Sequence, residues 1–291
     1  MPETHLVAGA AGSLGRQVVR EAARRGHRVR ALIHRTQLPE DLAAVVTEYH
    51  RGDALDPSQL KSVCDGVDVV FSCLGASVLP SFAKGRRPYT SVDTPANRNL
   101  IDAARGAGVQ KFVYVGVLSD GLGHLDYVRA HEQVVAALAT SGLDYVVVRP
   151  TGFFSAFGEF LPMAARGPVP LVGDGSAKTN PIHDADLASV CLDAVEGQER
   201  EIEVGGPETL TRREIVEQAF RALGKRVRVL PMPPAVVRLA ALLMRPINPR
   251  VSHFLAFVVA VSTRDLVAPA RGRRRLGDYF AERALQEFGS I

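Results

Sequence analysis

Near its N-terminus the chain reads Leu6-Val7-Ala8-Gly9-Ala10-Ala11-Gly12-Ser13-Leu14-Gly15. A short apolar run enters three glycines spaced three apart, and residues 16–25 continue with the pattern of a helix. A strand, a glycine-rich turn and a helix N-terminus together form a cradle for a phosphate, because the first-turn N–H groups and the positive end of the helix dipole favour an anion. The stretch therefore predicts the first unit of a nucleotide-binding α/β fold.

Each glycine of this turn has a separate role. Gly9 permits the tight turn, Gly12 lets the backbone approach a pyrophosphate, and Gly15 lets the helix pack closely on the strand. Glycines at this spacing also occur in ordinary turns, so the context has to decide between the two interpretations. A second strand-like run at 27–33 follows after one helix, as a βαβ nucleotide unit requires, and we therefore favour the cofactor site.

Composition and charge set the class of protein. The 291 residues are 46% apolar and 23% charged, which is typical of a folded protein with one large domain, with or without a smaller lobe. The net charge of +4 suits an anionic cofactor. The basic run Arg271–Arg275 is either a solvated segment or a nucleic-acid or lipid patch. No aromatic residues interleave with it, so we expect no nucleic-acid partner.

The cysteines and the absence of targeting signals favour a cytoplasmic protein. Cys64, Cys73 and Cys191 form no C-x-x-C pair, and we expect reduced thiols in a core. The sequence has no apolar signal region at its start and no window of about 18 apolar residues that could span a membrane. Nothing in it resembles a zinc motif, so we predict no metal site, and we assign residues 183–186 (His-Asp-Ala-Asp) to hydrogen bonding at a helix start.

Strand-like and helix-like segments alternate along the chain, which predicts a Rossmann-type, doubly wound parallel sheet with helices on both faces. The expected strands are residues 5–9, 28–33, 45–50, 68–74, 111–117, 144–149 and 201–204. The expected helices are residues 14–25, 57–63, 94–107, 127–141 and 185–196.

The pattern changes after Pro150. We predict an NAD(P)-binding domain at 1–150, to which 181–204 returns as part of the sheet. The remaining stretches, 151–180 and 205–291, are expected to form a small, mainly helical lobe that holds the substrate. We expect a loop at 167–179, and helices at 211–223, 234–244 and 252–261.

Two segments of this lobe are unusually apolar, 236–244 and 254–261. One interpretation is a buried pair of helices. The other is a surface that covers an apolar substrate or contacts a protein partner or a membrane. The sequence leaves the oligomeric state open.

The end of the second expected strand favours NADP(H), with NAD(H) as the alternative. NAD binders usually place an acid there for the ribose hydroxyls, whereas here the strand ends in His34 and Arg35 and no acid follows until Glu40. Arg35 could clamp a 2′-phosphate, unless it is only a solvent-facing loop residue. Asp53 suits a hydrogen bond to the adenine amino group, or else it is a turn aspartate.

With these residues the chain resembles an atypical short-chain dehydrogenase/reductase of the NmrA-like, NAD(P)-binding type. The resemblance covers most of the sequence. It rests on Gly9-x-x-Gly12-x-x-Gly15, Gly52-Asp53, Val92-Asp93, Asn99–Ala104, Gly108–Val115, Ser141–Tyr145 and Arg149–Phe154. The resemblance and the glycine turn together imply that the cofactor contacts Gly9, Ala11, Gly12, Ser13, Leu14, Gly15, His34, Arg35, Asp53, Ala54, Leu74, Gly75, Ala76, Gly116, Pro150, Thr151, Gly152 and Phe153.

The resemblance also implies a catalytic helix that carries Tyr-x-x-x-Lys, with a serine nearby. Here Tyr127 is present, but His131 replaces the lysine, Gly116 occupies the usual serine position, and Ser119 is the candidate substitute. A cation 4 Å from a tyrosine is worth about 4 kcal/mol at an effective dielectric constant of 20, or roughly three pKa units. A histidine that is neutral at pH 7 cannot supply this effect, so Tyr127 could donate a hydrogen bond but would be a poor base.

This departure shapes the predicted reaction. A conjugated acceptor needs an acid less than a simple ketone does, because its reduced anion is delocalised. We therefore predict that NADPH transfers hydride to an apolar conjugated acceptor, such as a quinone, an enone or an aromatic ketone. The residues assigned to the substrate are Phe154 and Phe157, although core packing is an equal alternative for both. The competing interpretation is an NADP(H)-binding redox sensor or assembly factor without catalysis.

Overall fold

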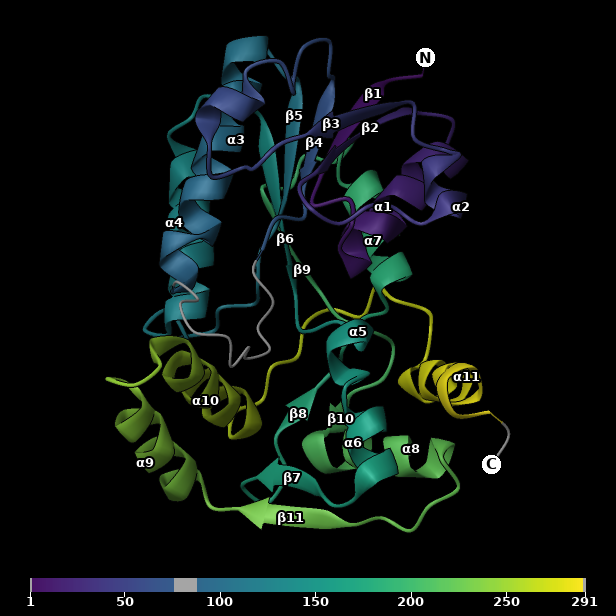
Figure 1. The fold of residues 1–291 in the computed structure, drawn as a ribbon, viewed down its shortest axis with the longest axis vertical. Coiled ribbons are helices and arrows are strands. Elements are labelled where there is room, and N and C mark those ends of the chain that lie inside the picture. The colour runs from purple at the N-terminus through teal and green to yellow at the C-terminus, as the bar shows by residue number, and fades with distance from the viewer. Residues whose placement is uncertain (1, 76–87, 290–291) are drawn as a thin grey trace.

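A computed structural model describes residues 2–75 and 88–289 (Figure 1). Seven parallel strands form one sheet in the order β3-β2-β1-β4-β5-β6-β9. The strands are β1 (Thr4–Ala8), β2 (Arg28–Ile33), β3 (Glu48–Arg51), β4 (Val69–Ser72), β5 (Lys111–Val115), β6 (Tyr145–Pro150) and β9 (Glu201–Val204). This is the doubly wound parallel sheet that the alternating pattern predicts.

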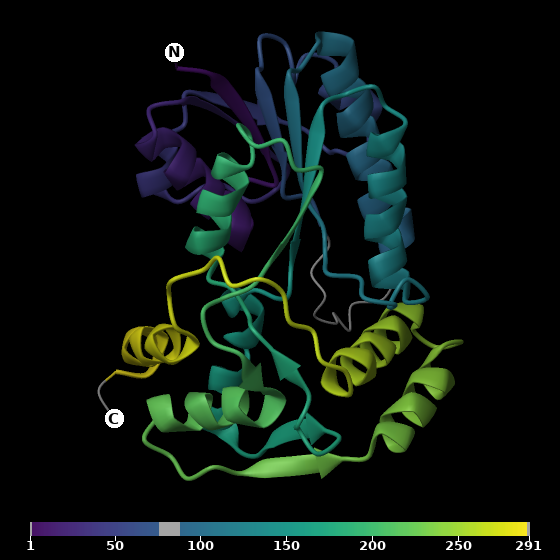
Figure 2. The ribbon, with the colours of Figure 1, turned by 180° about the vertical axis from the view of Figure 1, so that it is seen from behind.

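Helices cover both faces of the sheet, because alternate strand residues point to opposite sides. Val7 and Val113 face a layer that contains α1 (Ser13–Arg24) and α7 (Asp184–Asp193), which pack on each other. Leu6 and Phe112 face the other layer, formed by α3 (Asp93–Ala107) and α4 (Asp126–Ala139). Figures 1 and 2 show the same three layers from opposite sides.

The order in which successive strands join the sheet reverses at β1, and this positions the site. β1 pairs with β2 on one side and with β4 on the other, so the carboxyl ends of these strands form the edge where such sheets bind ligands. The short helix α2 (Glu40–Ala43) lies between β2 and β3. The predicted helix at 57–63 is a 3-10 helix, η1 (Pro57–Leu60), which starts at the capping aspartate Asp56.

Below the sheet lies a second, mainly helical part of the molecule, which we call the lower part (Figure 1). Its helices are α5 (Phe154–Phe157), α6 (Phe160–Arg166), α8 (Arg212–Ala222), α9 (Pro234–Met244), α10 (Pro249–Ser262) and α11 (Leu276–Phe288). The prediction of a loop at 167–179 is wrong, because this segment contains β7 (Val169–Val172) and β8 (Lys178–Thr179). They pair with β11 (Val229–Met232) and β10 (Leu210–Thr211), which come much later in the chain.

The lower part is tied to the sheet by buried polar contacts. Asn180 is 2% exposed, and its amide exchanges hydrogen bonds with both backbone groups of Ala268. Asp186, in the first turn of α7, accepts hydrogen bonds from the backbone N–H groups of Arg273 and Arg274. The basic run before α11 is therefore anchored on the sheet's own helix layer. No helix among the described residues is long and apolar enough to cross a membrane.

Candidate functional site

The glycine turn after β1 is closely packed. Gly9 has φ +81°, and a Cβ there would lie 2.7 Å from the carbonyl oxygen of Cys73 at the end of β4. A Cβ on Gly15 would lie 2.1 Å from the carbonyl oxygen of Gly9. The N–H of Gly12 donates to that same carbonyl, at 2.9 Å. Side chains would therefore disrupt the turn at two of its three glycines.

The first turn of α1 suits an anion. Gly12 is the N-cap and supplies no side-chain hydrogen bond, and no acidic residue lies in the first turn. The backbone N–H groups that begin α1, at Ser13, Leu14 and Gly15, therefore point to where a ligand can accept from them. This narrow, uncapped turn fits the pyrophosphate of a dinucleotide.

The hydroxyl of Ser13 links the turn to the lower part of the molecule. Its oxygen lies 3.1 Å from the hydroxyl oxygen of Ser155, which donates to the carboxylate of Asp184 at 2.7 Å. Asp184 begins α7, and His183 caps that helix by accepting from the N–H of Ala185. The residues at 183–186 therefore have the structural roles that the sequence assigns to them.

The predicted adenosine end lies at the ends of β2 and β3. His34 and Arg35 are exposed, and Arg35 makes no ion pair with any other described residue. Asp53 accepts a hydrogen bond from the N–H of Leu55 at 3.0 Å, and one of its oxygens lies 3.9 Å from His34 Nε2. Asp53 thus holds the turn with one carboxylate oxygen, and its other oxygen lies near His34.

A residue that the sequence did not indicate, Asn97, organises the end of β4. It is fully buried, accepts from the hydroxyl of Ser72 at 2.6 Å, and donates to the carbonyls of Asp93 and Leu74. It thereby fixes the strand end at Leu74 and Gly75, while Ala76 lies outside the described residues. A neighbouring amide, that of Asn99, donates to the carbonyl of Ala54 at 2.9 Å.

The ends of β5 and β6 supply the predicted nicotinamide side. Gly116 is buried after β5, and Pro150 ends β6. The hydroxyl of Thr151 donates to the carbonyl of Asn180 at 2.6 Å. The backbone N–H of Thr151 donates to the carbonyl of Val204 at 3.2 Å, and the carbonyl of Gly152 accepts from the N–H of Ile182 at 2.9 Å, so this turn is held firmly. A Cβ on Gly152 would lie 2.9 Å from the ring of Phe157. Phe153 follows, half-buried, beside the parallel bridge to Ile182.

Phe154 and Phe157 have different environments. Phe154 is 1% exposed and packs against His183 and Tyr279 in the core of the lower part, so its assignment to the substrate is wrong for this conformation. An apolar side chain at the start of a short helix is more stable in that core than at an open cleft. Phe157 is half-buried and lies against Gly152, with the guanidinium of Arg212 5.8 Å from its ring centroid.

Tyr127 and His131 lie on one face of α4, but they do not form a hydrogen-bonded pair. Their rings pack edge to face with centroids 4.8 Å apart. His131 Nδ1 instead accepts from the hydroxyl of Tyr114, at 2.6 Å. The ring of Tyr127 also packs edge-on against Tyr89 and Phe257, each with centroids 5.1 Å away.

The electrostatics of this pair follow from burial. His131 is 4% exposed, and burial, together with the nearby charge of Arg149, lowers its pKa to about 4. Burial likewise raises the pKa of Tyr127 above its ordinary value. At neutral pH both groups are therefore uncharged, and no cation on α4 lowers the pKa of Tyr127. The expectation that His131 is neutral agrees with this finding.

Arg149, in β6, forms a cluster of buried charge beside α4. Its guanidinium bonds to Glu132 at 2.6 Å, to Glu201 at 2.8 Å and to the carbonyl of Val117 at 3.1 Å. Burial alone would lower its pKa, but the two carboxylates raise it. Glu132 thus helps to neutralise a buried cation beside the site.

Asp126 is a second polar centre that the sequence did not indicate. It is 6% exposed and accepts from the backbone N–H of Tyr89 and from Arg129. His253, from α10, lies 3.1 Å from the same carboxylate. Burial alone would raise its pKa, but the hydrogen bond from Arg129 and the charge of His253 lower it overall. Asp126 thus joins α4 to α10. The other predicted polar group, Ser119, is half-buried in the loop before α4.

A family model described as NAD(P)H-binding matches residues 9–198 of this sequence. This match covers most of the chain, including the glycine turn, α4 and α7. The chain belongs to the NAD(P)H-binding family. Its cofactor is accordingly of the NAD(P)(H) type, which the narrow turn and the uncapped α1 accommodate.

Members and neighbours of the family differ in what their names state. Divinyl chlorophyllide a 8-vinyl-reductase of Zea mays is 32% identical over 249 residues, 79% of this chain and 62% of that protein. The chain thus spans about three-fifths of that relative. Photosystem II assembly factor Ycf39 of Cyanophora paradoxa is 26% identical over 241 residues, 81% of this chain and 73% of that protein.

A solved structure has the same fold. The NADPH-dependent quinone oxidoreductase of Escherichia coli, complexed with NADPH, superposes with a TM-score of 0.72 at 20% identity. The match covers 96% of this chain and 99% of that chain. It supports the Rossmann architecture of this family member over almost its whole length.

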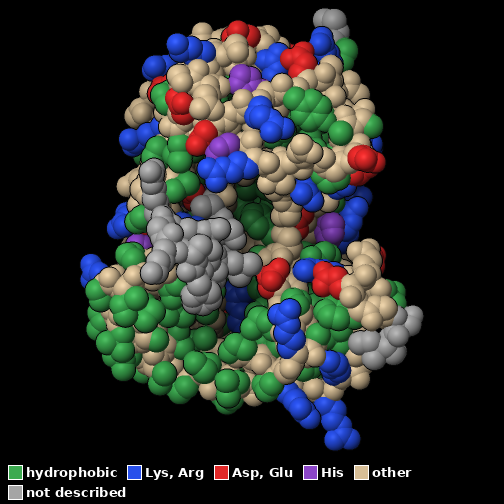
Figure 3. Space-filling model, viewed as in Figure 1, with side chains coloured by type: hydrophobic (Ala, Val, Ile, Leu, Met, Phe, Trp, Pro, Cys, Tyr) green, Lys and Arg blue, Asp and Glu red, His purple; other side chains and the backbone are tan. Residues whose placement is uncertain are grey.

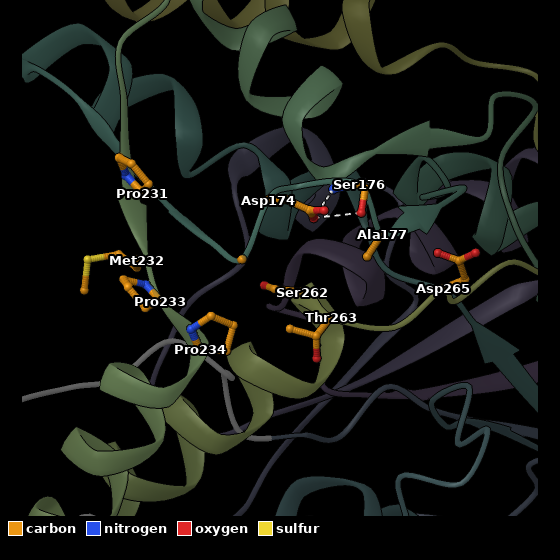
Figure 4. Close-up of a pocket in the computed structure, with 11 residues that line it drawn as sticks. Asp174, Ser176, Ala177, Pro231, Met232, Pro233, Pro234, Ser262, Thr263 and Asp265 are labelled. Atoms are coloured by element: carbon orange, nitrogen blue, oxygen red, sulfur yellow. Dashed lines mark hydrogen bonds between the residues drawn. The ribbon is translucent and has the colours of Figure 1, made fainter.

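One pocket lies away from the family's cofactor edge. It encloses about 820 Å³ between the β7–β8 loop, the end of β11 and the facing ends of α9 and α10 (Figure 4). Asp174, Asp265 and Thr263 are among its lining residues, and none of the predicted site residues is. The space-filling view shows a separate hollow between the sheet and the lower part (Figure 3).

A metal site was not expected, and the described residues contain one group that could be considered for it: Glu3, His5 and His27. The two imidazole rings are stacked with centroids 3.9 Å apart and an interplanar angle of 20°. Nearly parallel rings direct their in-plane lone pairs side by side and not toward one point. The group also lies at the opposite ends of the strands from the glycine turn, so it has no part in the cofactor site.

Proposed function

We propose that the protein is an NADPH-dependent reductase that transfers hydride to an apolar, conjugated acceptor. The observation that carries this proposal is the hydrogen bond from Tyr114 to His131, combined with the neutral state of His131. His131, which stands where the resembled reductases carry a lysine, accepts a hydrogen bond from the buried Tyr114 and carries no charge at pH 7.

This arrangement selects the acceptor. Tyr127 keeps its proton, because burial and the nearby Asp93 raise its pKa and the charge of Arg250 opposes them only in part. A protonated tyrosine can donate one hydrogen bond, but it is a weak acid for a localised alkoxide. A quinone or an enone spreads the negative charge of its reduced anion over the conjugated system, so one hydrogen bond is enough.

The chain's own residues supply binding and orientation. The first turn of α1 holds the pyrophosphate, Arg35 pairs with the 2′-phosphate of NADPH, and the turn at Thr151 and Gly152 supports the nicotinamide. Phe157, behind Gly152, provides an apolar wall. Bound NADPH supplies a hydride to the acceptor, and a proton from water completes the two-electron reduction.

Two of the comparisons support this reaction class. The maize relative is named for the reduction of a vinyl group, and the Escherichia coli structure is that of a quinone oxidoreductase. Both names describe reduction of an unsaturated acceptor.

A screen of NADPH oxidation tests the proposal. The purified protein is assayed with quinones, enones, aromatic ketones and simple aliphatic ketones under identical conditions. We expect kcat/KM for at least one conjugated class to exceed that for aliphatic ketones by about a hundredfold, a difference of about 3 kcal/mol in transition-state stabilisation. Turnover of aliphatic ketones without turnover of quinones or enones would refute it.

A second function, NADP(H) binding without catalysis, is favoured by the same uncharged Tyr127 and His131 and by the similarity to an assembly factor. The two functions are separated by combining a binding assay with the screen. Tight NADPH binding without oxidation by any acceptor class supports the sensor or assembly role, whereas oxidation that depends on an acceptor supports the reductase.

A further inference from the structure

The outer face of α9 is apolar and exposed to solvent. Val237 and Ala241 are buried against the rest of the protein. On the opposite side the exposed fractions rise to 63% for Leu242 and 59% for Leu243. The exposed apolar residues of α9 and the turn that follows are Val236, Leu239, Leu242, Leu243 and Ile247, and we call this set the α9 face. Figure 3 shows hydrophobic side chains covering the part of the molecule where Figure 1 places α9 and α10.

The stretch of sequence that includes the α9 face is rich in basic residues. Between Glu217 and Asp265 the sequence contains no aspartate or glutamate. The exposed basic residues in this interval are Arg221, Lys225, Arg226, Arg228, Arg238, Arg245 and Arg264. Of these residues, Arg238 and the C-cap residue Arg245 belong to α9, and they can attract an anion beside the α9 face. The acidic residues Asp174 and Asp265 line the pocket at the start of α9.

The two arginines nearest the α9 face lie along its edge. Arg238 and Arg245 are seven residues apart, so they lie on one edge of the helix, between its buried and its exposed apolar sides. An apolar face bordered by arginines is typical of a helix that lies flat in the interface of a bilayer. The aliphatic stems of the arginines then follow the apolar surface, while their guanidinium groups reach lipid phosphates.

We propose that the α9 face docks on the surface of a membrane that contains anionic lipids. The helix has 11 residues, and no described helix can span a bilayer, so it lies on the membrane and does not cross it. A protein partner would need acidic groups around an apolar centre, whereas a bilayer of anionic lipids presents both chemistries continuously.

The docking surface is connected to the candidate site through one helix. α10 packs along α9, and its Phe257 contacts the ring of Tyr127. The guanidinium of Arg250, at the start of α10, lies 3.5 Å from the ring centroid of Tyr89, which itself packs on Tyr127. Docking through α9 would therefore place the candidate site close to the lipid surface. The docking proposal itself does not depend on catalysis.

Vesicle flotation without cofactor or substrate tests the proposal. The full chain is mixed with vesicles of phosphatidylglycerol and phosphatidylcholine in equal parts, or with vesicles of phosphatidylcholine alone. We expect about tenfold more protein to float with the anionic vesicles, and we expect that excess to fall as salt is raised.

Matched variants locate the surface. The double variant Leu242→Ser/Leu243→Ser should lose about tenfold in binding, and Arg238→Ser/Arg245→Ser should lose the preference for anionic vesicles. The control is Leu285→Ser on α11, where the leucine is 62% exposed and thus as accessible as Leu242. This variant should float like the unaltered protein, and circular dichroism should show that all variants are folded.

Three results would overturn the proposal. They are the absence of flotation with anionic vesicles, flotation that the two double variants leave unchanged, and a dimer of the unaltered protein that Leu242→Ser/Leu243→Ser dissociates while no form binds vesicles. The last result would assign the α9 face to a second copy of the chain. None of these results bears on NADPH oxidation, which is measured separately.

Discussion

The hydroxyl of Tyr114 on β5 lies 2.6 Å from Nδ1 of His131 on α4, and both side chains are buried. Burial raises the pKa of Tyr114, so the tyrosine donates and the histidine accepts. His131 therefore carries its own proton on Nε2, and it serves the contact between the sheet and α4. The position that carries a lysine in the family's reductases holds a neutral, structurally engaged ring here.

Replacing Tyr114 with phenylalanine should destabilise the protein. The buried Nδ1 of His131 would lose its donor, and an unsatisfied buried acceptor costs about 1–3 kcal/mol. Urea unfolding followed by circular dichroism at pH 7.5 measures the change. Tyr49→Phe is the control, because Tyr49 is 49% exposed. Equal stability of the two variants would contradict the importance of this bond.

Acid should destabilise the protein through His131. Its pKa is lowered from 6.5 to about 4 in the folded state, so between these values the unfolded chain binds a proton that the folded chain does not. The free energy of unfolding therefore falls as pH decreases through this range, by about 3 kcal/mol for this group. Urea unfolding at pH 7.5 and pH 4.5 should show a shallower dependence for His131→Asn. If His131→Asn left the pH dependence of the free energy of unfolding unchanged, His131 would be excluded as a cause of the acid destabilisation.

Gly12→Ala should weaken cofactor binding while leaving the fold intact. A Cβ there would meet only the carbonyl oxygen of Gly9, at 3.3 Å, but it would fill the space where a pyrophosphate approaches the backbone. We expect NADPH affinity, measured by fluorescence titration, to fall by about tenfold or more. Gly106→Ala in α3 is the control, because a Cβ there meets nothing within 4 Å. Full affinity in Gly12→Ala would argue against this cradle.

Arg35→Gln should discriminate between the two dinucleotides. The variant loses the charge that would pair with a 2′-phosphate, so NADPH binding should weaken by about tenfold and NADH binding should change little. Titration of both cofactors measures the ratio. Arg24→Gln, at the far end of α1, removes an equal charge from an exposed position and serves as the control. A parallel loss for NADH and NADPH would rule out the phosphate clamp.

Glu132→Gln should cost more stability than Glu201→Gln, although both carboxylates bond to Arg149. Glu132 contributes two contacts to the buried guanidinium and is 35% exposed, whereas Glu201 contributes one and is 50% exposed. We expect losses of about 2 kcal/mol and below about 1 kcal/mol, respectively. Thermal unfolding of the two variants gives the order, and the reverse order would contradict the assignment.

The fold could be predicted because its signals are local. The strands expected at 28–33 and 201–204 coincide with β2 and β9. β2 ends in a buried apolar run, and β9, at the edge of the sheet, alternates exposed and buried residues, so each carries a strand pattern of its own. β7 and β8 were missed because Gly, Pro and Asp surround them and their partners, β11 and β10, are distant in the chain. Such strands are defined by pairing more than by their own composition.

Some residues of the candidate site could likewise be predicted from local sequence, and others could not. The glycine turn could be predicted, because one short segment supplies the whole cradle. The partner of His131 could not, since Tyr114 lies 17 residues earlier on another element. The role of Asp126 could not be predicted either, because its contacts come from the backbone before α3 and from α10. Phe154 was misassigned because its sequence neighbours do not reveal which side of α5 faces the core.

The packing of α7 on α1 has a consequence for the unity of the chain. Val18 and Val19 of α1 share a core with Leu187 and Cys191 of α7, which come after the first 150 residues. β9, also later in the chain, pairs with β6 along the edge of the sheet. A cut after residue 150 would therefore expose the flank of the first crossover helix. The sheet part is thus completed by residues that follow the first segment of the lower part in the chain.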